Sequence, residues 1–106
     1  MIEFIKTLLG LGPATDLKEV MDRGAQLIDV RTAGEFRDGH IRGAVNIPLH
    51  TLNRNLSRIR KDKPVITCCA SGVRSASAKS ILKSNGFNEV YNGGGWTGLQ
   101  GKLSVK

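Results

Sequence analysis

Short apolar runs alternate along this chain with segments of helical spacing, and this alternation strongly limits the folds open to it. The runs predicted as strands are residues 25–30, 44–47, 64–68 and 89–91. Helical segments are predicted between them, at residues 16–23, 32–37, 49–59 and 75–85. Strands separated by helices favour a parallel sheet covered on both faces. The sequence therefore predicts an α/β fold.

Two of these helices carry start signals in the sequence. Asp16 with Glu19, and Thr32 with Glu35, have the spacing of a capping box, in which two side chains satisfy the free backbone N–H groups of the first turn. Gly24 follows the first of these helices, where a glycine stops a helix easily. These signals support short helices in the first half of the chain.

A cysteine, Cys69, directly follows the third predicted strand and begins the loop before a helix. The loop runs from Cys69 to Arg74, between the strand at 64–68 and the helix at 75–85. Such a loop directs backbone N–H groups and the positive end of the helix at one point. We expect these donors, together with nearby Arg74, to stabilise a Cys69 thiolate. Ligands of parallel sheets bind beyond the carboxyl ends of strands, which is where Cys69 falls.

Length and charge narrow the possible functions. The chain has 106 residues, enough for one domain with one core, and a net charge of +7. This charge suits an anionic substrate, a nucleic acid or an acidic partner. Basic residues do not alternate with aromatic ones in any block, which argues against nucleic-acid binding. The densest basic segment, residues 58–63, is interpreted as a solvated helix end and loop.

The two cysteines, Cys68 and Cys69, are adjacent and do not form a disulfide framework, which indicates a reducing compartment. Residues 1–14 are apolar, but Glu3 and the lack of a clear cleavage site argue against a signal peptide. We treat them as an N-terminal extension whose apolar residues have helical spacing. No segment has transmembrane length, so we expect no membrane contact and a cytoplasmic protein.

Several blocks together resemble the signature blocks of a rhodanese domain, in the same order and at compatible spacing. They are residues 27–31, 35–36, 39–48, 69–75 and 86–94. The resemblance extends over residues 15–95 and assigns residues 15–106 to one rhodanese domain. It implies a three-layer α/β/α fold with a central parallel sheet of about five strands.

The resemblance implies a sulfurtransferase. Cys69 would attack a small anionic sulfur donor such as thiosulfate, hold the sulfane sulfur as a persulfide, and pass it to a thiophilic acceptor such as cyanide, a thiol or a protein. The residues implied to hold the persulfide or the donor are Ala70, Ser71, Gly72, Val73, Arg74 and Ser75. Ser75 could instead cap the following helix. The resemblance implies no metal and no organic cofactor, and we expect a monomer.

Two other functions stay open on the same fold. Related cysteine-based phosphatases and arsenate reductases carry a loop one residue longer, which suits a tetrahedral oxyanion; six residues from Cys69 to Arg74 favour a single sulfur. Those enzymes also have an acidic residue in the loop, which this chain lacks. A non-catalytic rhodanese module usually loses the cysteine, and this chain retains it.

The remaining polar residues near the motifs are interpreted as structural. Asp29 and Arg31 are expected to tie neighbouring loops together, Glu35 to cap a helix, and His40 to bridge a turn. Cys68 is expected to be buried in the sheet, with a resolving thiol as the alternative.

The C-terminus departs from the usual rhodanese pattern. Trp96 directly follows the glycine run, where many members place a tryptophan several residues later. We therefore expect a short or absent final helix and no pocket-lining role for Trp96. A shortened end would leave Cys69 more open, which suits a protein persulfide donor over thiosulfate.

Overall fold

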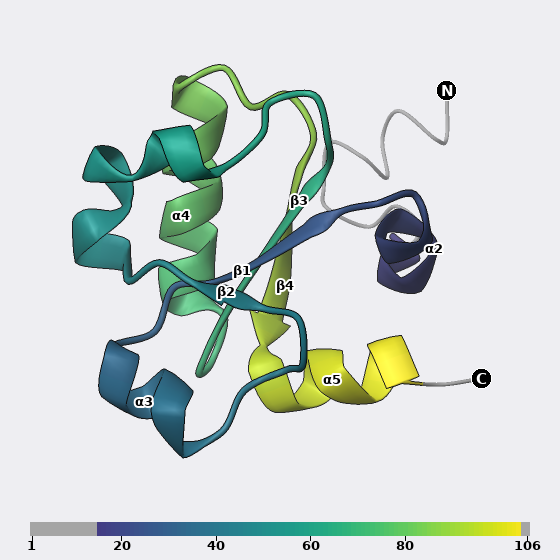
Figure 1. Ribbon diagram of the computed structural model, residues 1–106. Helices are drawn as coiled ribbons and strands as arrows, with labels where there is room; N and C mark the ends of the chain where they lie inside the picture. The colour runs from purple at the N-terminus through teal and green to yellow at the C-terminus, as the bar shows by residue number, and fades with distance from the viewer. Residues whose placement is uncertain (1–14, 105–106) are drawn as a thin grey trace.

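The computed structural model describes residues 15–104, which form a sheet flanked by helices (Figure 1). The predicted extension at residues 1–14 lies outside the described residues. In chain order the elements are α2 (Leu17–Asp22), β1 (Gln26–Asp29), α3 (Ala33–Asp38), β2 (Val45–Asn46), the 3-10 helices η1 (Leu49–Arg54) and η2 (Leu56–Arg58), β3 (Val65–Cys69), α4 (Val73–Ser84), β4 (Val90–Gly95) and α5 (Trp96–Ser104).

All strand pairs in the described sheet are parallel, in the order β2-β1-β3-β4. The four runs predicted as strands are confirmed, although β3 begins one residue later than predicted and includes Cys69. The expectation of about five strands is wrong for residues 15–104, which contribute four. That fifth strand came from the family resemblance, because the apolar runs themselves indicated four.

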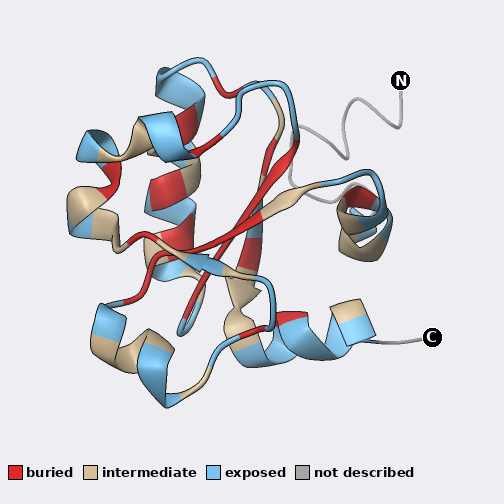
Figure 2. Ribbon diagram, viewed as in Figure 1, coloured by how far each residue is buried: buried red, intermediate tan, exposed pale blue. Residues whose placement is uncertain are grey.

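Helices cover both faces of this sheet, which confirms the three-layer arrangement. On one face, Leu52 of η1 and Leu82 of α4 pack in a cluster with Ile28 and Val65 of the strands. On the other face, α2 and α5 cover a second cluster (Figures 1 and 2). Members of that second cluster include Val20, Leu27, Ile66, Cys68 and Leu99. The buried strands lie between the two layers, as Figure 2 shows.

The predicted capping boxes differ in outcome. Thr32 and Glu35 form a complete box at the start of α3, with both reciprocal hydrogen bonds present. At α2 only half of the box forms: the Asp16 carboxylate accepts from the Glu19 N–H, while the Glu19 side chain accepts from Arg23 one turn later. The ion pair with Arg23 therefore takes the carboxylate that the box required.

Two helical predictions are corrected by the structure. The segment at 49–59 forms two short 3-10 helices instead of one helix, and Asn55 interrupts it with a non-helical φ of −128°. Helix α4 begins at Val73, not at Ser75. Its N-cap is Gly72, and Ser75 is therefore not a cap but an interior residue of the first turn.

The final helix, expected to be short or absent, is present and short. Helix α5 has nine residues and begins at Trp96 itself. Leu99 of this helix is buried against the sheet, which supplies the apolar contact that holds a short helix in place. The Trp96 ring lies over the guanidinium of Arg31, 4.7 Å from ring centre to Cζ. Among residues 15–104, no helix is long and apolar enough to cross a membrane.

Two glycines near the C-terminus, Gly93 in β4 and Gly98 in α5, give a test of how tightly α5 packs on the sheet. A Cβ on Gly93 would lie 2.8 Å from Leu99 Cδ2 and 2.9 Å from the Thr67 carbonyl oxygen, whereas a Cβ on Gly98 meets no atom within 4 Å. We expect Gly93→Ala to lower the free energy of unfolding by about 1–3 kcal/mol, since overpacking forces the backbone to shift. Gly98→Ala should raise it by about 0.5–1 kcal/mol through helix propensity. Denaturant unfolding of both variants measures this, and equal stability of the two contradicts the packing.

Candidate active site

Cys69 is the last residue of β3, and its sulfur lies under the loop that leads into α4. The residue is 0% exposed and belongs to the core cluster on the α4 side of the sheet. Because β1, β3 and β4 are parallel, their carboxyl ends meet at the same edge, where Cys69 pairs with Gly95 and Asp29 pairs with Cys68. The structure therefore places Cys69 at the edge of the sheet where the sequence predicted it to lie.

Three hydrogen-bonding groups converge on the Cys69 sulfur. The Gly72 N–H donates to Sγ at 3.0 Å, and the Ser75 N–H donates at 3.3 Å. The thiol lies 3.5 Å from Ser75 Oγ, to which it donates its own hydrogen. Gly72 holds its N–H in this position with a φ of +103°, a left-handed conformation that favours glycine. The loop thus forms the predicted cradle around one sulfur atom.

These donors decide the ionisation of Cys69. Burial raises the pKa of the thiol, but the Ser75 hydroxyl and the N–H groups of Ser75, Gly72 and Ser71 lower it further than burial raises it. The net pKa is below the ordinary value for a cysteine. The site therefore favours a thiolate at lower pH than a free cysteine does.

Arg74 was expected to support the thiolate with its positive charge, and the structure shows that its hydrogen bonds go to another residue. Its guanidinium binds the Glu35 carboxylate with two hydrogen bonds, of 2.7 and 3.0 Å. Glu35 at the same time caps α3 through Thr32, so one carboxylate joins α3 to the active-site loop. Sequence analysis found the cap but missed this second role, because the partners are far apart in the chain.

Glycines of β4 form the wall against which the loop packs. A Cβ on Gly95 would lie 2.8 Å from the Ala70 carbonyl oxygen, and a Cβ on Gly72 would lie 3.3 Å from Gly94 Cα. The close approach of two backbones therefore requires small residues on both sides. The glycine run was recognised in the sequence as a family block, but its contact with the loop was not predicted.

The residues at the outer rim of the loop differ from those at the sulfur. Ala70 and Ser71 are exposed, and Val73 is 72% exposed although it is apolar. Ser71 contributes through its backbone N–H, as stated above, and Ser75 is fully buried. Of the predicted site residues, Ser71, Gly72 and Ser75 act on the sulfur, while Ala70 and Val73 form the rim.

The buried pair behind the loop is structural, as predicted. The Arg31 guanidinium donates to the Asp29 carboxylate at 2.7 Å and to the Gly39 carbonyl at 2.7 Å. Both side chains are buried, and Trp96 covers the guanidinium. His40 is also structural: its Nδ1 lies 2.7 Å from the Phe36 carbonyl oxygen.

Cys68 faces the opposite side of the sheet from Cys69. It belongs to the cluster under α2 and α5, because side chains of consecutive strand residues point to opposite faces. Burial, with a smaller effect from Asp29, raises the pKa of the Cys68 thiol to about 12. The expectation that Cys68 is buried is confirmed, and its direction and high pKa do not suit a thiol that resolves a Cys69 persulfide.

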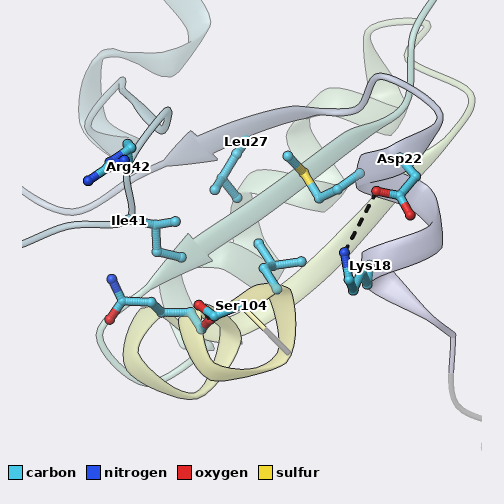
Figure 3. Close-up of a pocket in the computed structure, with 9 residues that line it drawn as sticks. Lys18, Asp22, Leu27, Ile41, Arg42 and Ser104 are labelled. Atoms are coloured by element: carbon cyan, nitrogen blue, oxygen red, sulfur yellow. Dashed lines mark hydrogen bonds and ion pairs between the residues drawn. The ribbon is translucent and has the colours of Figure 1, made fainter. Parts of the chain in front are cut away.

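A cavity of about 420 Å³ lies away from this site, between α2, α5 and the segment before β2 (Figure 3). Leu27 and Ile41 line it together with Lys18, which pairs with Asp22 across one helical turn. None of the residues from Cys69 to Ser75 lines it. Within residues 15–104, no three His, Cys, Asp or Glu side chains gather in a group that could hold a metal ion.

Comparison with known proteins places this geometry in context. A family model described as rhodanese-like domain matches residues 13–102. The chain is 49% identical over 85 residues to the uncharacterized protein YqhL of Bacillus subtilis, covering 79% of this chain and 68% of that protein. It is 32% identical over 80 residues to the thiosulfate sulfurtransferase GlpE of Pseudomonas savastanoi, covering 76% of each. The crystal structure of a rhodanese-like domain protein from Staphylococcus aureus superposes with a TM-score of 0.69 at 32% identity, covering 85% of this chain and 89% of that one.

The opposite environments of the two thiols give a direct test. In native protein at neutral pH we expect iodoacetamide to modify Cys69 and to leave Cys68 unmodified, because only Cys69 has a lowered pKa. Intact mass and peptide mapping identify the modified residue. Cys69→Ser should take up no label until the protein is denatured. Labelling of Cys68 in the native fold contradicts the assignment.

The Glu35–Arg74 pair predicts that the stability of the fold depends on pH in the acid range. Arg74 and Thr32 lower the pKa of Glu35 from 4.5 to about 2. A depressed carboxyl pKa stabilises the fold above the unfolded value, and this stabilisation is lost as pH falls from about 4.5 to about 2. Carboxyl NMR should show the pKa of Glu35 rising towards its ordinary value in Arg74→Met. The lowered pKa of Glu89, which depends on Arg23, is the internal control and should not move.

Proposed function

This chain belongs to the rhodanese-like domain family, and on that premise we propose that it is a sulfurtransferase that carries a sulfane sulfur as a persulfide on Cys69. The observation that carries the proposal is the convergence of the Gly72 and Ser75 N–H groups on one buried sulfur. A relative with 32% identity is named thiosulfate sulfurtransferase, which supports the same class of reaction.

The reaction proceeds in two displacements on sulfur. The Cys69 thiolate attacks the outer sulfur of thiosulfate, a new S–S bond forms, and the S–S bond of thiosulfate breaks to release sulfite with its electron pair. The acceptor, cyanide or a thiolate, then attacks the outer sulfur of the persulfide. The Cys69–S bond breaks, its electron pair returns to Sγ, and the acceptor leaves with the sulfur. The loop donors stabilise the negative charge that Sγ carries before the first step and after the second.

The loop geometry favours sulfur over phosphate or arsenate as the transferred group. Arg74 is engaged by both oxygens of Glu35, whereas an oxyanion-binding site needs its arginine for the oxygens of the substrate. Ala70 and Gly95 approach each other so closely that a Cβ on Gly95 would lie 2.8 Å from the Ala70 carbonyl oxygen. An arginine already engaged by a carboxylate, and a loop packed tightly against β4, both support a single sulfur over a tetrahedral oxyanion as the occupant.

We propose a small anionic donor such as thiosulfate. The argument for a protein donor depended on an open approach to Cys69, whereas the Cys69 side chain is buried. A cysteine that is 0% exposed is reached more easily by a small ion than by the side chain of another protein. The net charge of +7 raises the local concentration of anions around the chain.

Intact mass spectrometry after incubation of reduced protein with thiosulfate tests this function. We expect a gain of one sulfur atom, which cyanide removes, and no gain in Cys69→Ser. Cys68→Ser is the matched control and should gain the sulfur as the native protein does, because Cys68 faces the other side of the sheet.

Three outcomes contradict the proposal in different ways. A sulfur gained by both the native protein and Cys69→Ser would move the chemistry to Cys68. No gain from thiosulfate, with gain from glutathione persulfide, would overturn the proposed donor and keep the reaction class. No gain from either donor, with hydrolysis of a phosphate ester, would assign the site to the phosphatase branch of the fold.

A further inference from the structure

Asn92 in β4 is exposed and far from Cys69 in sequence, yet its side chain joins three parts of the active-site loop and its wall. Its Oδ1 accepts from the Ser75 hydroxyl at 2.6 Å and from the Gly94 N–H at 2.9 Å. Its Nδ2 donates to the Gly72 carbonyl at 3.1 Å. Two of these partners, Ser75 and Gly72, are also the residues whose N–H groups donate to the Cys69 sulfur.

The two backbone partners determine which way the Asn92 amide points. The Gly94 N–H can only donate, so it requires the oxygen of the amide. The Gly72 carbonyl can only accept, so it requires the nitrogen. With both satisfied, Asn92 presents its oxygen to Ser75, and an oxygen can only accept the hydroxyl hydrogen. The backbone therefore makes Asn92 an acceptor towards Ser75.

Ser75 has one hydroxyl hydrogen and two neighbours that can accept it. Asn92 Oδ1 lies at 2.6 Å, a short O–H···O distance, and Cys69 Sγ lies at 3.5 Å. While Cys69 carries its own hydrogen, the thiol donates to Ser75 and Ser75 donates to Asn92, so the three groups form one directed chain. A sulfur that is negatively charged has no hydrogen to donate and competes for the hydroxyl of Ser75.

We propose that Asn92 is a positioning residue that holds the Ser75 hydroxyl hydrogen away from the sulfur while Sγ is uncharged, and releases it when charge develops on Sγ. Sγ is uncharged in the thiol and, on the proposed function, in the persulfide, whose charge lies on the outer sulfur. When the acceptor removes that sulfur, the electron pair returns to Sγ and the Ser75 hydroxyl turns from Asn92 to Sγ. In this step the Ser75 hydroxyl rotates and keeps its proton. When the thiol ionises instead, the proton that leaves is that of Cys69, and it passes to solvent.

The inference implies that Asn92 opposes ionisation of Cys69, although it belongs to the network around the thiolate. The charged and titratable groups around the sulfur are Arg74 with its partner Glu35, the Asp29–Arg31 pair, and Cys68. In the described part of the chain, the Asn92 side chain bonds to none of these groups. A change at Asn92 therefore reaches the sulfur through Ser75 and the loop backbone.

Asn92→Ala tests the proposal, with the pH dependence of thiolate ultraviolet absorbance as the readout. We expect the pKa of Cys69 to fall by about 0.5–1 unit, because the freed Ser75 hydroxyl donates to the thiolate without competition. In a Ser75→Ala background the same Asn92→Ala change should leave the pKa unchanged. Asn85→Ala is the matched control: it removes an exposed amide that donates to the Ile81 carbonyl at the far end of α4, and it should not move the pKa.

Two results overturn the proposal. A rise in the pKa in Asn92→Ala would mean that the amide acts by supporting the loop, since a looser loop loses its donors. An equal fall in the Ser75→Ala background would mean that the effect does not pass through Ser75. Circular dichroism and the unfolding midpoint confirm that each variant is folded. The titration uses no sulfur donor, so a result that overturns the role of Asn92 is distinguishable from a failure of the proposed sulfurtransferase function.

Discussion

The structure depends on favouring the charged form of a sulfur that lies inside an apolar core. Cys69 is buried in the cluster between β3 and α4, and burial alone raises the pKa of its thiol. Hydrogen bonds from Gly72, Ser75 and Ser71 reverse that effect. The N–H groups of Gly72 and Ser75 are available because the start of a helix leaves its first N–H groups without partners inside the helix. The strand end, the tight loop and the helix start therefore form one unit whose geometry serves the sulfur.

This unit is held in place by contacts that are remote in sequence. The glycines of β4 let the loop backbone approach the sheet edge, and a Cβ at Gly95 would push the Ala70 carbonyl away. Glu35 of α3 fixes Arg74, and Asn92 of β4 binds Ser75 and Gly72. The loop is thus clamped on two sides by elements that precede and follow it in the chain.

A second polar network, around Arg31, holds the elements that contact the active-site loop. Arg31 is buried with Asp29, donates to the carbonyls of Glu35 and Gly39, and is covered by Trp96. A buried ion pair is costly unless every donor has a partner, and here the fork of the guanidinium is shared between a carboxylate and two carbonyls. Within residues 15–104 no buried side-chain nitrogen or oxygen lacks a hydrogen-bond partner. The network fixes α3 against β1 and so fixes Glu35, the partner of Arg74.

The sequence by itself determined the α/β class, the four strands, the place of Cys69 at the end of a strand and the capping box at Thr32, because apolar periodicity and capping are local properties of a few consecutive residues. It left open whether a final helix forms, and the burial of Leu99, a tertiary effect, supports the short helix α5. It placed Arg74 near the sulfur without identifying Glu35 as its hydrogen-bond partner, since spacing shows which residues are near and not which partner they bind. Only the tertiary structure decided that Glu35 takes Arg74 and that Asn92 takes Ser75, because these pairs form where separate strands and helices meet at one sheet edge.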